Sequence, residues 1–260
     1  MIGMGILKKS IKSLVSIGVL IALWALVVET GRFEKSLFPS PAMVLKGIGE
    51  IMEDGSLFEN FRVSIIRFLI GYLAAVFAGV ILGLLLGWNK KVWAYVDPVI
   101  QVLRPVSPIA WFPFIVLWFG IGDAPAVATI FIAAFYPILL STVSGVGNVD
   151  RIYMKVADNF GIKQPGLLFK VILPAAFPII ANGLHLALGS AWVFLVAGEM
   201  IGAQSGLGFM IIDARNTLRS DLVLAGIIII GILGLLLDRF IGLLEGRIKR
   251  QWGIFTEVRN

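Results

Sequence analysis

The polar residues with the most suggestive spacing lie inside an apolar stretch of the C-terminal half. Asn182, His185 and Gly189, continued by Val193 and Val196, recur at intervals of three and four residues. On a helix that turns by about 100° per residue, these positions lie along one side. Polar groups are costly facing lipid, so this stripe should face other helices or a hydrated cavity. Two interpretations are open: a hydrogen-bonded contact between helices, or the lining of a solute pathway.

Few other residues offer catalytic or metal-binding chemistry. The chain has no cysteine and a single histidine, which excludes disulfides and thiolate zinc sites and disfavours a histidine-rich metal site. It contains no phosphate-binding loop of the form G-x-x-x-x-G-K-[ST]. The sequence therefore predicts a protein that is not an enzyme and that holds no metal or cofactor of its own.

The composition indicates a membrane protein. Of the 260 residues, 58% are hydrophobic and 15% are charged, and the mean hydropathy is +0.95. One soluble core could not bury so much apolar surface. A helix needs about 20 residues to cross the hydrocarbon. Six crossings are expected, at about 11–28, 61–88, 105–119, 124–147, 171–200 and 222–244.

The basic residues predict the orientation of these helices. Most of the 22 lysines and arginines fall in segments that are cytoplasmic if the N-terminus is cytoplasmic, and acidic residues gather in the outer segments. The positive-inside rule then places both termini in the cytoplasm. Because the basic residues are spread over every inner loop, the net charge of +6 does not indicate nucleic-acid binding.

The inner segment between the fourth and fifth crossings is predicted to form a helix, a turn and a helix. Asn148 or Asp150 can cap the first helix, which runs to about residue 160. Gly161 suits a left-handed stop, and Pro165 fits the first turn of the second helix.

An apolar stripe follows the first of these inner helices. Ile152, Val156 and Phe160 recur at helical spacing. The stripe either packs against the protein's own crossings or forms an interface for a soluble partner, since exposed apolar patches commonly mark interfaces.

Other residues have structural interpretations. Arg62 and Arg67 are expected to be interfacial anchors whose stems lie along apolar surface. Prolines in the third crossing should break its helix, and the aromatic residues beside them, Trp111 and Phe112, either pack or form a gate. Short outer helices are expected near 40–55 and 205–216. Regularly spaced glycines predict close helix packing at Gly71, Gly79, Gly83 and Gly87.

The order of these segments resembles a known family. The spacing from Gly161 to Leu173 and Pro174, followed by AAFPIIANGLHLALGSAWVFLVAGEMIGAQSGLGFMIIDARN, resembles the permease subunit of binding-protein-dependent ABC importers. The sulfonate, taurine and nitrate permeases are the most similar group. The resemblance covers nearly the whole chain and implies an all-α integral membrane fold of the type I importer, with six transmembrane helices in one domain, 1–260.

This resemblance implies the partners and the roles of particular residues. Partner ATP-binding subunits would bind ATP and Mg, an external solute-binding protein would deliver the solute, and a second identical copy would complete the permease in a bacterial cytoplasmic (inner) membrane. The inner loop, about 148–170, would dock the ATPase through Ile152, Lys155, Val156, Ala157, Phe160, Gly161 and Pro174. The pathway would include Asn182, His185, Gly189, Trp111 and Phe112.

Two positions depart from the family pattern. The family loop usually contains Glu-Ala-Ala where this chain has Lys155, Val156 and Ala157, and arginine is common at the position of His185. The expected solute is an aliphatic sulfonate, taurine or nitrate. The alternatives are a thiamine precursor or another small organic molecule. A secondary transporter or channel is a weaker alternative, because such proteins usually place coupling acids inside their spans.

Overall fold

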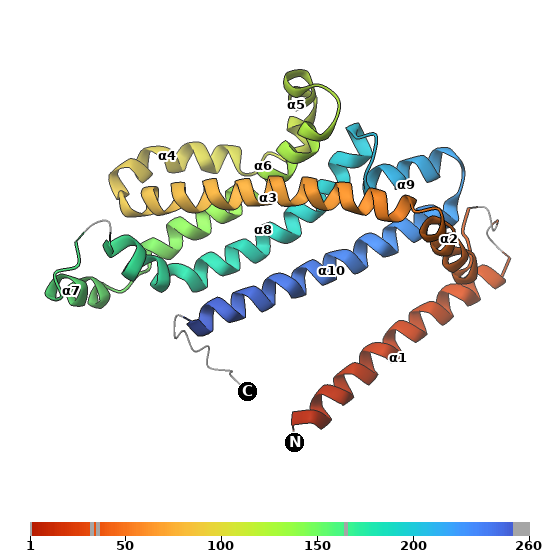
Figure 1. Ribbon diagram of the computed structural model, residues 1–260, viewed down its shortest axis with the longest axis horizontal. Coiled ribbons are helices and arrows are strands. Elements are labelled where there is room, and N and C mark those ends of the chain that lie inside the picture. The colour runs from red at the N-terminus through yellow and green to blue at the C-terminus, as the bar shows by residue number, and fades with distance from the viewer. Residues whose placement is uncertain (1, 32–33, 35–36, 164–165, 252–260) are drawn as a thin grey trace.

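The computed structural model describes residues 2–31, 34, 37–163 and 166–251, which are helical with short connections and contain no strand. Figure 1 shows a bundle of long helices with short helices at both ends. The helices are α1 (Ile2–Glu29), α2 (Pro41–Glu53), α3 (Ser56–Trp88), α4 (Lys90–Leu103), the 3-10 helix η1 (Pro108–Trp111), α5 (Phe112–Phe119), α6 (Asp123–Gly147), α7 (Arg151–Asn159), the π-helix η2 (Leu168–Ile172), α8 (Leu173–Gly202), α9 (Leu207–Asn216) and α10 (Ser220–Gln251).

The membrane-spanning helices agree with the predicted all-α membrane fold. Four are long and apolar enough to cross a bilayer: Ser56–Trp88, Asp123–Gly147, Leu168–Gly202 and Ser220–Ile248. A fifth span forms if the bent pair Lys90–Leu103 and Pro108–Phe119 is counted as one. The first predicted crossing falls in α1, whose shorter apolar part is Val15–Glu29. The described residues therefore give four or five spans by length and composition, and the predicted number of six is not confirmed.

The third predicted crossing, 105–119, is not one straight helix. Its α-helical part, α5, has eight residues and is about 12 Å long, well short of the hydrocarbon thickness. The preceding α4, which was not expected, meets the η1–α5 segment at 86°. Pro105 and Pro108 lie at this break. Ser107, before Pro108, is extended (φ −58°, ψ 133°), because a proline disfavours helical geometry in the residue before it. Arg104, before Pro105, stays helical. The prediction that the third crossing is a broken helix is confirmed, with Pro108 at the break and Pro113 in the first turn of α5.

The centre of the bundle is formed by α3, α6 and α8. A Cβ atom built on Gly71 would lie 2.8 Å from the side chain of Ile130, and one on Gly79 would lie 2.8 Å from Ile138. Gly83 and Gly87 approach α6 in the same way. Between membrane helices, small residues allow the backbone contacts that drive association. The predicted role of these four glycines is confirmed.

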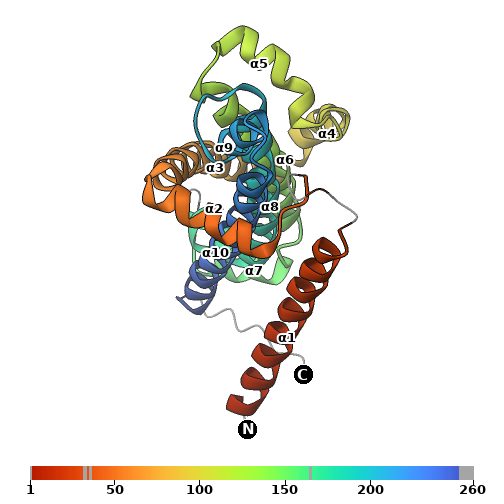
Figure 2. The ribbon, with the colours of Figure 1, turned by 90° about the vertical axis from the view of Figure 1, so that its right-hand side faces the viewer.

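The short helices lie at opposite ends of the bundle. In Figure 1, α7 lies at one end, and α2 and α9 lie at the other. The short helices predicted near 40–55 and 205–216 are confirmed as α2 and α9, and their position on the outer face stays a prediction. Figures 1 and 2 show α1 leaning away from the bundle, with α2 beside its C-terminal end. A hydrogen bond of 3.2 Å from Trp24 Nε1 to the carbonyl of Pro39 holds this end of α1.

Candidate functional site

The α7 helix begins and ends as its sequence predicts. The Asp150 carboxylate accepts a hydrogen bond of 2.9 Å from the backbone N–H of Ile152, so Asp150, not Asn148, is the N-cap. Gly161 has a φ of 67°, and the N–H of Ile162 reaches the carbonyl of Ala157 at 2.9 Å. Pro165 lies outside the described residues.

The second inner helix is continuous with α8. The π-helix η2 precedes α8 directly, and the half-buried Pro174 lies in the first turn of α8. A π-helical turn inside an α-helix frequently marks a functional site. The inner segment therefore passes directly into a membrane-spanning helix, instead of forming a separate helical hairpin.

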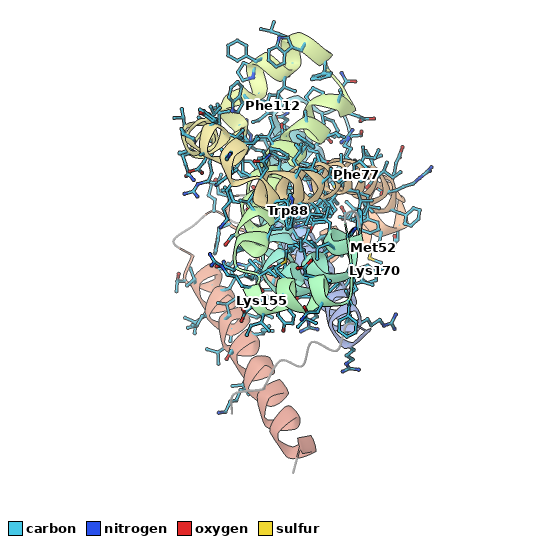
Figure 3. All side chains as sticks on the ribbon, turned by 90° about the vertical axis from the view of Figure 1, so that its left-hand side faces the viewer. Met52, Phe77, Trp88, Phe112, Lys155 and Lys170 are labelled. Carbon is cyan, nitrogen blue, oxygen red and sulfur yellow. The ribbon has the colours of Figure 1, made fainter. Side chains whose placement is uncertain are left out.

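The apolar stripe of α7 is exposed. Ile152, Val156 and Phe160 expose 64%, 46% and 79% of their surface, and Lys155 is also exposed. Among the described residues, the stripe does not pack against the protein's own helices, so that interpretation is wrong. Figure 3 looks onto this end of the molecule, where Lys155 and Lys170 are labelled.

The opposite side of α7 is anchored to the bundle. Ala157 is 2% exposed. Met154 packs against a cluster formed by Leu84 of α3, Val146 of α6 and Ile172 at the start of α8. A force applied to the exposed side of α7 would therefore act on the ends of three membrane helices.

The predicted stripe on α8 divides between two environments. Asn182, Gly189 and Val193 are exposed, and Leu186 beside them exposes 69% of its surface. These residues form a face of α8 that no described part of the chain covers. His185 is half-buried and turns toward α10 instead.

His185 makes a polar contact between helices. Its Nδ1 atom lies 2.9 Å from a carboxylate oxygen of Glu245, and Nε2 lies 3.4 Å from an oxygen of Asp238. Asp238 and Glu245 are seven residues apart on α10 and so share one face, a spacing that could have been read from the sequence. The described residues contain no group of three or more side chains suited to a metal ion.

The two aromatic pathway candidates lie far from this contact. Phe112 is 5% exposed and packs against Gly198 and Gly202 at the C-terminal end of α8. Trp111 is half-buried. Residues 185 and 202 are separated by about 25 Å along a helix. Within one copy of the chain, the predicted pathway residues therefore do not form a single cavity.

A buried polar cluster that the sequence interpretation missed lies at the other end of the bundle. Arg67 of α3 is only 3% exposed, so the prediction that it is an interfacial anchor is wrong. Its Nη1 atom lies 3.0 Å from Glu199 of α8 and 2.6 Å from the carbonyl of Ser205. Its Nε atom donates to Asp123, the first residue of α6, at 2.8 Å. Arg62 is exposed, as expected for an anchor.

Neighbouring groups satisfy the remaining oxygens of Glu199. The hydroxyl of Ser64 donates to the carboxylate at 2.7 Å, and the N–H of Gly208 donates at 2.9 Å. The N–H of Leu207 donates to Ser64 Oγ at 2.8 Å. The cluster joins α3, α6 and α8 to the start of α9. The spacing of Ser64 and Arg67 on one helix face was the available sign of it.

A second polar contact attaches α2 to the turn between α9 and α10. The guanidinium of Arg219 lies 2.6 Å from Glu50 and 2.7 Å from Asp221. Hydrogen bonds to Asp221 and Glu50 raise the pKa of Arg219 above its usual range. This end of the molecule is therefore held by two separate polar clusters.

Comparison with known proteins gives close relatives. The chain is 37% identical over 239 residues to SsuC of Bacillus subtilis (strain 168), a permease protein named for aliphatic sulfonates transport, covering 92% of this chain and 87% of that one. It is 35% identical to the taurine transport system permease protein TauC of Escherichia coli (strain K12), covering 91% and 88%. The nitrate import permease protein NrtB of Leptolyngbya laminosa is 38% identical, covering 75% and 70%.

A structural comparison and a family match point to the same class of protein as these relatives. A chain of the MetNI methionine ABC transporter, in an inward-facing conformation, superimposes with a TM-score of 0.53 at 17% identity, covering 76% of this chain and 94% of that one. Residues 58–250 match the family described as the binding-protein-dependent transport system inner membrane component. The chain therefore belongs to the family of binding-protein-dependent transport system inner membrane components and has the fold of an ABC transporter permease.

Proposed function

We propose that this chain forms the membrane pathway of an ATP-driven importer for an aliphatic sulfonate, taurine or nitrate. The names of the relatives support this class of solute. The observation that carries the proposal is the position of α7. It presents an exposed apolar stripe on one side and is anchored to three membrane helices on the other.

In this proposal, α7 is the docking site of a partner ATPase. Apolar side chains rimmed by polar groups suit a protein interface, and the exposed residues of α7 have this arrangement. ATP and Mg would bind to the partner. Closure of two ATPase subunits around ATP would move α7, and α7 would move the ends of α3, α6 and α8. A solute delivered by a binding protein would then meet a pathway that opens to one side of the membrane at a time.

A second identical copy would complete the pathway. The uncovered face of α8 carries Asn182, Leu186, Gly189 and Val193, which mix polar, small and apolar groups. Two such faces, one from each copy, would enclose a route between them. His185 would support this face through its contacts with α10, and Trp111 and Phe112 would border the route near the other end of α8.

The proposed orientation places α7 and both termini in the cytoplasm, in a bacterial inner membrane. The positive-inside rule supports this orientation. It places α2 and α9 on the outer face, where a binding protein could reach them. Transport requires that the solute or its carrier favour one conformation over the other.

Reconstitution tests this proposal. The permease and its ATPase subunits are placed in liposomes with ATP inside and with the binding protein, loaded with taurine, an alkanesulfonate or nitrate, outside. We expect uptake that requires both ATP and the binding protein. Uptake that continues without the ATPase would favour a channel or secondary transporter. A binding protein that retains a thiamine precursor instead would assign the alternative solute.

A further inference from the structure

Two short helices, α7 and α9, end in the same type of turn, but different residues occupy its left-handed position. After α7, the left-handed position is occupied by Gly161, with a φ of 67°; after α9, it is occupied by Leu218, with a φ of 58°. Leu218 is the one non-glycine residue with a positive φ in the described part of the chain. A side chain makes this conformation unfavourable, which is why glycine is the usual residue there.

The hydrogen bonds of the α9 turn explain why the backbone must be left-handed. The N–H of Arg219 donates to the carbonyl of Ala214 at 2.9 Å, and the N–H of Leu218 donates to that of Arg215 at 3.1 Å. This pair of bonds defines the Schellman motif, in which the residue after the C-cap is left-handed. The turn thus accounts for the backbone conformation but not for the leucine.

The leucine side chain contributes little to packing within the chain. It is 85% exposed, the highest value among the large exposed hydrophobic residues in the described part of the chain. A residue that costs backbone energy and buries almost nothing does not stabilise its own fold. Residues held in such unfavourable backbone conformations cluster at functional sites.

The surrounding contacts hold the leucine in a fixed position. The next residue, Arg219, is clamped to Glu50 of α2 and to Asp221 of α10. The turn is therefore tied to two helices besides α9. It presents an apolar tip at the end of the molecule opposite α7, where α9 lies close to α2 (Figure 1). Exposed Arg215, Asn216 and Thr217 form a polar rim beside this tip.

We propose that Leu218 is a docking residue for the external binding protein. This inference rests on the proposed function, which places the α9–α10 turn on the outer face. The family's description as binding-protein-dependent indicates a soluble partner, which in the proposed orientation would engage that face. A rigid apolar residue inside a polar rim matches the usual centre of a protein interface. The exposed charges of Asp213 and Arg215, beside the ion-paired Arg219, suit a hydrated protein contact better than insertion into a bilayer.

Substitutions at Leu218 separate docking from folding. Leu218→Gly and Leu218→Asn keep a left-handed turn but remove the apolar tip, whereas Leu218→Met keeps an apolar side chain. In lipid nanodiscs that also contain the ATPase, we expect the first two to raise the binding-protein concentration for half-maximal ATP hydrolysis by about tenfold or more. Leu218→Met should stay close to the parent. The melting temperature of Leu218→Gly should be unchanged or higher, because the substitution relieves strain.

The control is Leu235→Ala on α10. Leu235 is 65% exposed and lies in the middle of an ordinary helix, away from α2 and α9. This variant should leave the binding-protein concentration for half-maximal ATP hydrolysis unchanged. If the binding protein stimulates the parent complex and Leu218→Gly responds identically, the docking inference is wrong and the proposed function stands. If no binding protein stimulates the parent complex, the proposed function fails and the inference fails with it.

A single cysteine identifies what covers the leucine. Because the chain contains no cysteine, Leu218→Cys can be labelled with a fluorophore that reports polarity. We expect the fluorophore to emit as it does in water. Its emission should shift to shorter wavelengths when taurine-loaded binding protein is added. Emission that is apolar from the start and insensitive to the binding protein would show insertion into the bilayer and overturn the inference. Reaction with thiol reagents only from the cytoplasmic side would do the same.

Discussion

Arg67 of α3 and Glu199 of α8 form an ion pair in the interior of the protein, with 3.0 Å between Nη1 and Oε1. The two residues expose 3% and 1% of their surface. Burying a charge is costly unless it is paired and hydrogen-bonded. Asp123, Ser205 and Ser64 supply the remaining hydrogen bonds. The pair therefore joins helices that are far apart in the sequence into one unit at this end of the bundle.

The first prediction concerns this ion pair. Arg67→Met should destabilise the protein by about 3–5 kcal/mol, because it leaves the Glu199 carboxylate buried without its cation. The measurement is thermal unfolding in detergent, with folded yield as a second readout. Arg62→Met is the matched control, since Arg62 is exposed on the same helix. Equal stability of the two variants would show that the pair does not hold the bundle together.

The second prediction concerns the contact between α3 and α6. Gly71→Val should destabilise the protein by about 1–3 kcal/mol or more, because the new side chain would overlap Ile130 and the carbonyl of Val127. Gly231→Val in α10 is the control, since a Cβ at Gly231 meets nothing within 4 Å. Melting temperatures measured in the same detergent compare the two. A similar effect at both positions would contradict close packing at Gly71.

Local features of this fold could be predicted from the sequence, and long-range polar contacts could not. The cap at Asp150, the stop at Gly161 and the glycine stripe of α3 depend on neighbouring residues or on helical spacing. The burial of Arg67 depends on Asp123 and Glu199, whose proximity only the tertiary fold creates. A lone arginine near a helix end has the same local pattern whether it lies at the lipid interface or in a buried cluster.

The features of the candidate site also divide into those that the sequence predicts and those that depend on the tertiary fold. Helical spacing alone predicted an apolar stripe on α7, but only the structure shows that this stripe is exposed. His185 was recognised as notable, but its partners on α10 were not. The bend of 86° between α4 and the η1–α5 segment was suggested by prolines, yet its direction depends on packing against other helices.

The third prediction tests the proposed pathway face of α8. In this cysteine-free chain, Asn182→Cys and Gly189→Cys should react with a water-soluble thiol reagent in at least one nucleotide state of the assembled transporter. Ala187→Cys is the control, because Ala187 is fully buried on the other side of the helix. Labelling rates are compared with and without ATP. If positions 182 and 189 stay unreactive in every state, this face does not line a hydrated pathway.

The fourth prediction concerns Lys155, which stands where the resemblance to the permease family implies a glutamate. Lys155 is exposed on α7, close to the apolar stripe, so Lys155→Glu reverses a charge at the proposed interface. We expect less ATPase to co-purify, with the difference shrinking as salt is raised. Lys90→Glu, an exposed lysine at the start of α4, is the control. Stronger association of Lys155→Glu would mean that the partner presents a basic group at this position.

The fifth prediction tests α7 as the coupling element. Phe160→Ala should weaken ATPase binding by about 2 kcal/mol or more, because Phe160 is 79% exposed in the free chain and has the character of an interface anchor. Gly161→Val should be more harmful than Gly161→Ala, because a β-branched residue fits a φ of 67° poorly. Co-purification of the ATPase and ligand-stimulated ATP hydrolysis in lipid measure both effects. The melting temperature of each permease variant confirms that it remains folded. If folded Phe160→Ala and Gly161→Val proteins assemble and hydrolyse ATP like the parent, another segment transmits the force.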